Sequence, residues 1–136
     1  MILLPLLRDD TAVASKFVDM REYDNVDFLI LVGALDIEFD CKVQESVNAD
    51  GSLPSDITSA LITQVASTED NTMYVISVKK ETTTKRYVGL SADPGNGILG
   101  VNCAAVALRY NKTGMLPETQ EVAGSNSYAT DEVIRV

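Results

Sequence analysis

Apolar and polar residues alternate strictly along the segment that begins at Ile37. The apolar face carries Ile37, Phe39, Cys41 and Val43, and Val47 resumes it after Glu45. The polar face carries Glu38, Asp40, Lys42, Gln44 and Ser46. Because successive side chains of a β-strand point to opposite faces of a sheet, this alternation predicts a half-buried strand.

The preceding residues 27–32 (DFLILV) are continuously apolar after Asp27. A run of this length predicts a strand that is buried on both faces. Gly33 and the short link after it are expected to allow the turn into the alternating strand.

Further strands are separated by polar or turn-forming residues. Residues 73–80 (MYVISVKK) and 85–92 (KRYVGLSA) flank the polar residues 81–84, which predicts a hairpin. The turn signal 93–97 (DPGNG) leads into an expected long strand over 98–110. Residues 12–20 are a weaker strand candidate, and 21–25 are expected to form a polar turn.

The stretch 55–66 is ambiguous. Ile57, Ala60, Leu61 and Val65 lie at helical spacing, while 61–65 (LITQV) is typical of a strand. A short helical turn followed by a strand is the preferred interpretation.

Short strands with turn signals between them predict an all-β fold, an antiparallel β-sandwich or barrel of jelly-roll-like type with extended N- and C-terminal arms. A chain of 136 residues is long enough to build one core. Residues 1–110 are expected to form this β domain, including an apolar N-terminal segment. Residues 111–136 are polar and read either as a disordered terminus or as an arm that docks on a neighbouring subunit.

The charge balance narrows the choice of partners. Eleven Lys and Arg against 20 Asp and Glu give a net charge of −9, which argues against nucleic acid and anionic membranes. The basic cluster Lys79, Lys80, Lys85 and Arg86 is interpreted as a solvated hairpin tip rather than a phosphate site. No apolar run approaches the length of a membrane span and no cleavage-site pattern follows the N-terminus, so a soluble, unsecreted protein is expected.

Catalytic signatures are missing from the sequence. There is no histidine, no nucleophile elbow, no phosphate-binding loop and no dinucleotide fingerprint. Cys41 and Cys103 lie among apolar neighbours and are expected to be buried thiols, with a disulfide as the alternative. We therefore expect no enzyme, no cofactor and no metal.

A cluster of three acidic residues suggests an alternative function, calcium binding. Asp36, Glu38 and Asp40 share a strand face and could hold Ca²⁺, although solvation of an outer sheet face is the usual fate of such residues. Residues 48–52 (NADGS) resemble the opening of a calcium loop but lack its remaining ligands, so a turn is expected there.

Several short motifs occur in a recognisable order: 18–20 (VDM), 23–28 (YDNVDF), Gly33, 42–46 (KVQES), 70–78 (DNTMYVISV), 86–88 (RYV) and an Ala-rich segment that leads into Arg109 and Tyr110. In this layout, which covers roughly residues 12–112, the chain resembles the capsid decoration (cement) proteins of tailed phages. The resemblance implies a non-enzymatic homo-oligomer, a trimer or dimer, that binds the major capsid protein on the outside of the virion and stabilises the shell. Such a protein is assembled in the host cytoplasm and needs no cofactor, nucleic acid or membrane. The alternatives are another β-rich virion role, in head–tail joining or the tail, and a small calcium- or carbohydrate-binding β-domain.

Apolar residues at both ends of the chain are the expected interface. These candidates are Met1, Ile2, Leu3, Leu4, Leu6, Leu7, Val133, Ile134 and Val136. A core or edge strand is the alternative for the first seven residues, in which case Pro5 has to lie at an edge or bulge.

Overall fold

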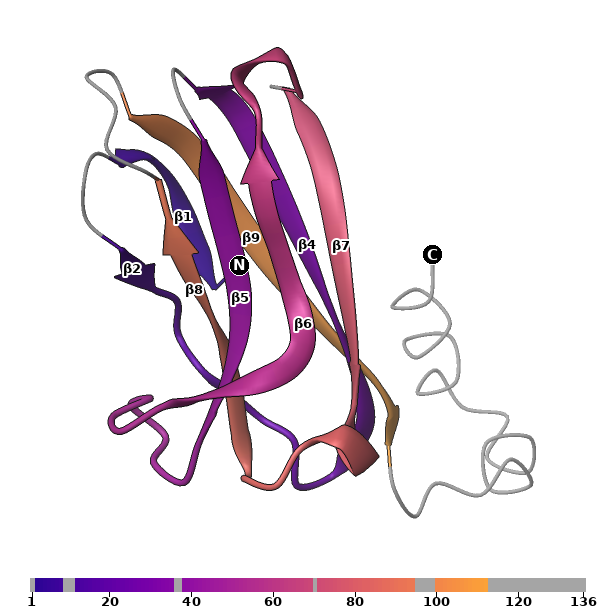
Figure 1. Cartoon of the computed structure of the whole chain (residues 1–136). Helices are drawn as coiled ribbons and strands as arrows, with labels where there is room; N and C mark the ends of the chain where they lie inside the picture. The colour runs from indigo at the N-terminus through magenta and orange to yellow at the C-terminus, as the bar shows by residue number, and fades with distance from the viewer. Residues whose placement is uncertain (1, 9–11, 36–37, 70, 95–99, 113–136) are drawn as a thin grey trace.

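The computed structural model describes residues 2–8, 12–35, 38–69, 71–94 and 100–112 (Figure 1). The strands are β1 (Leu3–Arg8), β2 (Val13–Ala14), β3 (Val18–Asp19), β4 (Tyr23–Leu35), β5 (Phe39–Ser46), β6 (Ser55–Val65), β7 (Thr72–Lys79), β8 (Tyr87–Asp93) and β9 (Val101–Lys112). Two single turns of 3₁₀-helix, η1 (Ser67–Glu69) and η2 (Lys80–Thr82), complete these elements, and the described residues contain no α-helix.

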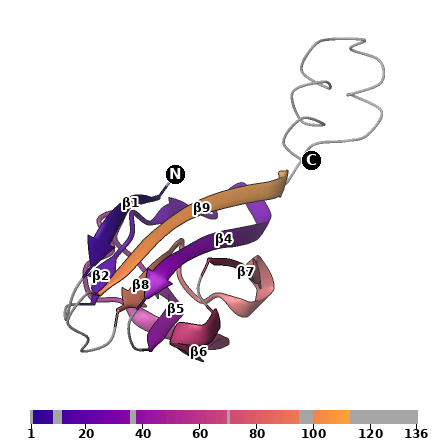
Figure 2. The ribbon, with the colours of Figure 1, turned by 90° about the horizontal axis from the view of Figure 1, so that it is seen from above.

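The strands form two antiparallel sheets that pack face to face. One sheet has the order β1-β9-β4-β7. In the other, β8 pairs with β2 and β3 along one edge and with β5 along the other, and β5 pairs with β6. Figure 2 shows the two layers from above, with β9 and β4 in one and β8, β5 and β6 in the other. The prediction of an all-β, sandwich-like fold is confirmed; its finer jelly-roll-like description stays a prediction.

The core lies between the sheets and is built from alternate residues of the long strands. The buried apolar side chains include Val26, Phe28, Ile30 and Val32 of β4, Phe39, Cys41 and Val43 of β5, Val88, Leu90 and Ala92 of β8, and Val101, Cys103 and Ala105 of β9. The alternation predicted for the β5 segment is therefore confirmed from Phe39 to Val43, while Ile37 lies outside the described residues.

Three expectations around this core are wrong. Residues 27–32 are not buried on both faces, because no described element covers the outer face of β4, and Leu31 is 52% exposed there. Val47 does not resume the apolar face of β5: it is 64% exposed, and the buried Glu45 takes the inward position. Gly33 is not a turn residue either, since β4 continues through it to Leu35.

The expected hairpin over residues 73–92 is also wrong. β7 pairs with β4 in one sheet, and β8 pairs with β5 in the other. The polar residues between β7 and β8 therefore cross from one sheet to the other through η2.

The ambiguous stretch 55–66 is a strand up to Val65, without the expected helical turn. Its inward residues Ile57, Ala60 and Val65 are spaced unevenly because the pairing of β6 with β5 is irregular. Ser59 and Gln64 have positive φ angles of 65° and 55°, which fits bulges that insert extra residues. These irregularities produced the apparent helical spacing.

The beginning of the chain contributes to both sheets. β1 is an edge strand whose backbone pairs with β9, and the register shifts between Leu3 and Leu6, where Pro5 lies. The strand expected over 12–20 is split into β2 and β3. Between them the hydroxyl of Ser15 accepts a hydrogen bond from the Leu90 N–H at 2.9 Å, in place of a backbone carbonyl. β4 then begins inside the expected turn 21–25. β9 forms the long strand expected over 98–110 from Val101 onward, while 95–99, which belong to that strand and to the expected turn 93–97, lie outside the described residues.

Phe17, between β2 and β3, lies on the outer face of β8 against two glycines. A Cβ atom added at Gly89 would lie 2.5 Å from a carbon of the Phe17 ring, and one added at Gly51 would meet the same ring. The absence of both side chains therefore lets the ring reach the sheet.

We expect Gly89→Ala to lower the free energy of unfolding by about 1–3 kcal/mol, because the new methyl group overlaps the ring. Chemical denaturation followed by circular dichroism measures this loss. In a Phe17→Ala background the same alanine should cost far less. An equal cost in both backgrounds would contradict the contact.

Candidate functional site

The acidic residues proposed for calcium do not form a site in the described part of the chain. Asp36 lies outside the described residues, and the Asp40 carboxylate accepts a hydrogen bond from the Gln64 N–H. Across the described residues no three His, Cys, Asp or Glu side chains gather closely enough to hold a metal ion. Residues 48–52 form the expected turn, in which Asp50 accepts hydrogen bonds from the N–H and hydroxyl of Ser52.

Both cysteines are buried thiols, and they do not form a disulfide. Burial, together with a smaller effect of the charge on Cys103, raises the pKa of the Cys41 thiol to about 12. Because the thiolate is the reactive form, Cys41 is unsuited to nucleophilic chemistry near neutral pH.

The structure places only part of the interface predicted at the chain ends. Ile2 is partly buried and packs against the core. Leu3, Leu4, Leu6 and Leu7 belong to β1, whose backbone pairs with β9 as an edge strand. The remaining candidates, Met1, Val133, Ile134 and Val136, lie outside the described residues.

A different apolar surface emerges on the outer face of the four-stranded sheet. We call it the outer patch, and it consists of Leu29, Leu31, Met73, Val75, Ala104, Val106 and Leu108. The strand register gathers these residues, since Leu29 pairs with Val75 and Val106, and Leu31 pairs with Met73 and Ala104. Leu31, Met73 and Val75 are 52%, 55% and 51% exposed. Three strands thus bring apolar side chains to this face, where Ala104 is buried and the other six are at least partly exposed to solvent.

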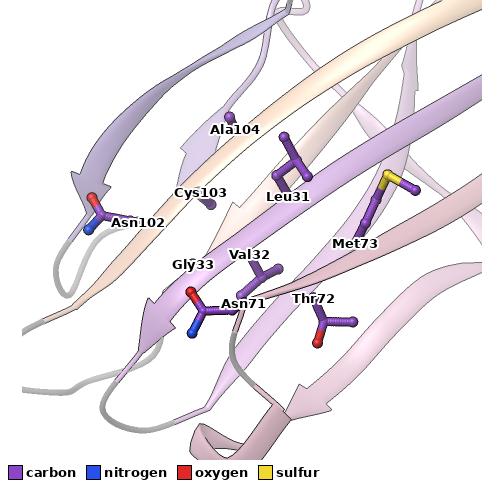
Figure 3. Close-up of a pocket in the computed structure, with 9 residues that line it drawn as sticks. All are labelled: Leu31, Val32, Gly33, Asn71, Thr72, Met73, Asn102, Cys103 and Ala104. Atoms are coloured by element: carbon purple, nitrogen blue, oxygen red, sulfur yellow. The ribbon is translucent and has the colours of Figure 1, made fainter.

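A shallow hollow of about 390 Å³ lies at one end of the outer patch (Figure 3). β4, β9 and the start of β7 line it. Leu31, Met73 and Ala104 belong both to the hollow and to the outer patch. A Cβ atom at Gly33 would lie 3.1 Å from the Asn102 carbonyl oxygen, so glycine relieves crowding between the strands here. Asn71, Thr72 and Asn102 supply polar groups to the lining.

The other end of the outer patch is closed by polar residues. The Tyr110 hydroxyl donates a hydrogen bond to Asp27 Oδ1 at 3.3 Å. Two residues before Asp27 on β4, Asn25 pairs with Lys79 of β7. Burial raises the pKa of Tyr110, and the neighbouring Asp27 carboxylate raises it further. An apolar centre with a polar rim is the usual anatomy of a protein–protein interface.

The basic residues do not form a hairpin tip, because no hairpin exists there. Lys79 ends β7, and the other three lie on the crossing to β8, where Arg86 donates two hydrogen bonds to the Asp19 carboxylate. This pairing with Arg86 holds the pKa of Asp19 far below its usual range, despite the opposing effect of burial. Lys79 lies 3.7 Å from Glu81.

Sequence reasoning missed the outer patch, although a signal for it was present. Residues 73–78 (MYVISV) and 104–108 (AAVAL) are apolar on both strand faces. Only one of these faces is covered by the opposing sheet, so the other is available for binding. The arrangement suits recognition of an apolar surface rather than catalysis.

No helix of sufficient length and apolarity to cross a membrane occurs in the described parts of the chain. The chain matches no protein-family model in a scan of such models, and a search of curated proteins finds no similar sequence.

Proposed function

We propose that this chain is a non-enzymatic structural protein of a tailed-phage virion, which binds the outside of the capsid as a dimeric or trimeric cement protein. The outer patch is the observation that carries the proposal, because contiguous exposed apolar surface on a folded domain marks a docking site. The motif resemblance supplies the identity of the partner, the major capsid protein.

The outer patch contains enough apolar surface to stabilise such a contact. Full burial of a Leu, Val or Met side chain contributes about 1.5–3 kcal/mol, so covering these half-exposed residues contributes about 1 kcal/mol each. Many copies on one shell add their contributions. A protein that binds only the assembled shell stabilises that state by mass action.

The outer patch has a matched control on the other sheet. Leu61 of β6 is 49% exposed, close to the value for Leu31, but lies on the opposite side of the sandwich. A charge introduced at Leu61 should leave capsid binding unchanged.

We expect Leu31→Lys to weaken co-sedimentation with capsids at least about tenfold, a loss of roughly 1.4 kcal/mol or more, because an ammonium group would be desolvated at the interface. The measurement is a sedimentation titration of wild type, Leu31→Lys and Leu61→Lys, with thermal melting to confirm folding. Equal binding of all three proteins would show that the outer patch is not the docking surface.

The proposed oligomer and copy number are tested separately. Light scattering should give two or three times the chain mass of 14.7 kDa. Quantitative mass spectrometry of purified particles should find hundreds of copies per virion. A handful of copies would instead identify a head–tail joining or tail protein.

A further inference from the structure

A second surface, distinct from the outer patch, lies at the end of the sandwich where β9 finishes. A hollow of about 400 Å³ is lined there by Met20, Arg21, Lys80, Thr83, Thr84, Lys85 and Arg86, and we call it the basic hollow. Four of its seven residues are cationic, in a chain whose net charge is −9.

Hydrogen bonds hold these cations in place. Lys80 Nζ donates to the Arg21 carbonyl oxygen at 2.7 Å, and Lys85 Nζ donates to Ser55 Oγ at 2.8 Å. Both acceptors are neutral, and each ammonium group has three donors, so the two lysines keep donors for an anion. Arg86 is fixed by its two bonds to Asp19.

Two carboxylates beside the basic hollow offset part of its charge. Asp19 is occupied by Arg86 and by the Arg21 N–H. Glu45 is buried and accepts hydrogen bonds from the N–H groups of Thr84 and Lys85. The seven lining residues of the basic hollow include four cations and no carboxylate, which leaves a surplus positive charge where an anion would bind.

We infer that the basic hollow is a carboxylate-binding site and that its occupant is the acidic segment 113–136 of the same chain. That segment contains Glu118, Glu121, Asp131 and Glu132 against a single basic residue, Arg135. Its charge is therefore complementary to the surplus charge of the basic hollow.

The position of the last described residues brings this segment to the basic hollow. Lys112 pairs with Tyr23 and lies 3.6 Å from Glu22, and Arg109 donates to the Asp19 carbonyl oxygen. Residues 19–23 also supply Met20 and Arg21 to the basic hollow. Glu118 and Glu121 follow Lys112 by six and nine residues, a reach of about 20–30 Å in extended chain.

The covalent connection between β9 and the acidic segment favours binding of the chain's own segment over that of another copy. A short covalent connection gives the attached acidic groups an effective concentration of about 1 mM, far above the concentration of a second copy in dilute solution. The inference does not rest on the proposed capsid role, because it needs no partner.

A spin label tests the inference in the full-length chain. Gly124→Cys supplies the labelling site, and the two native thiols are buried. In 10 mM salt we expect the amide signals of residues 83–86 to lose about half their intensity and to recover in 1 M salt, because the screening length falls from about 30 to 3 Å. Undiminished signals at low salt, or losses that salt does not reverse, would overturn the inference.

Charge reversals provide the matched variants. Lys80→Glu with Lys85→Glu should abolish the signal loss, and Lys16→Glu, an exposed lysine away from the basic hollow, should preserve it. If the double variant does not fold, Glu118→Lys with Glu121→Lys tests the same contact from the other side.

A mixture of isotope-labelled and spin-labelled copies separates binding within one chain from binding between two copies. Signal loss in that mixture equal to that within one chain would assign the contact to a second copy and overturn the intrachain inference.

Discussion

Replacing Phe28 by alanine is expected to lower the free energy of unfolding by about 3–5 kcal/mol, the usual cost of removing a buried aromatic side chain. Phe28 is completely buried between the two sheets, and its strand β4 is the central pairing partner of both β7 and β9. The cost combines lost apolar burial with an unfilled cavity. Urea denaturation of wild type and variant at equal protein concentration measures it.

Leu31→Ala is the matched control from the same strand. Because Leu31 already exposes half of its side chain, its truncation should cost less than about 1 kcal/mol in the dilute protein. A loss comparable to that of Phe28→Ala would mean that the outer patch is covered within the protein's own assembly. The pair of variants therefore separates core from docking surface along one strand.

The second large effect is expected at Glu45, the buried carboxylate at the end of β5. It accepts hydrogen bonds from the Thr84 N–H at 2.6 Å, the Lys85 N–H at 3.1 Å and the Thr84 hydroxyl. Glu45→Gln replaces one acceptor oxygen with a donor that faces other donors. We expect a loss of about 1–3 kcal/mol at pH 7, the cost of leaving buried polar groups unpaired. Glu81→Gln, at an exposed carboxylate, should have no measurable effect.

The comparison of wild type with Glu45→Gln also predicts a pH dependence of the free energy of unfolding. Burial raises the pKa of Glu45, but the hydrogen bonds from Thr84 and Lys85 together outweigh it, so the folded-state pKa lies below the usual 4.5. Since the folded protein holds this proton less tightly than the unfolded chain, the stabilisation is complete above pH 4.5 and is lost as the pH falls through the folded-state pKa. Denaturation midpoints measured between pH 7 and pH 2 should show the gap between wild type and Glu45→Gln closing in acid. A constant gap would contradict the role of the charged form.

The fold class followed from the sequence because the alternation of side chains is a local property. β5 shows the limit of that argument at Glu45, whose inward position depends on hydrogen bonds to residues about 40 positions later. β6 shows a second limit, since its irregular pairing with β5 around Ser59 and Gln64 interrupts the regular alternation of inward residues. Local spacing cannot distinguish a strand with two bulges from a helical turn.

The sequence signalled apolar strand faces but not their assembly into one patch, for a related reason. Leu31 belongs to an apolar run that is typical of full burial, and its exposure depends on how many layers cover β4. Its neighbours Met73 and Ala104 come from strands about 40 and 70 residues away, and only the register places them beside it. The mistaken hairpin had the same origin, because the choice between pairing within one sheet and crossing to the other is made by distant partners.

The strand order also determines when this molecule can fold. Among the described strands, β5 and β6 are the only chain neighbours that pair, and the four-stranded sheet joins β1 to β9 at opposite ends of the described chain. Such non-local pairing slows folding to the range of about milliseconds to seconds. Of the described strands, β1 is synthesised before its partner β9, so its backbone stays unpaired until β9 has left the ribosome.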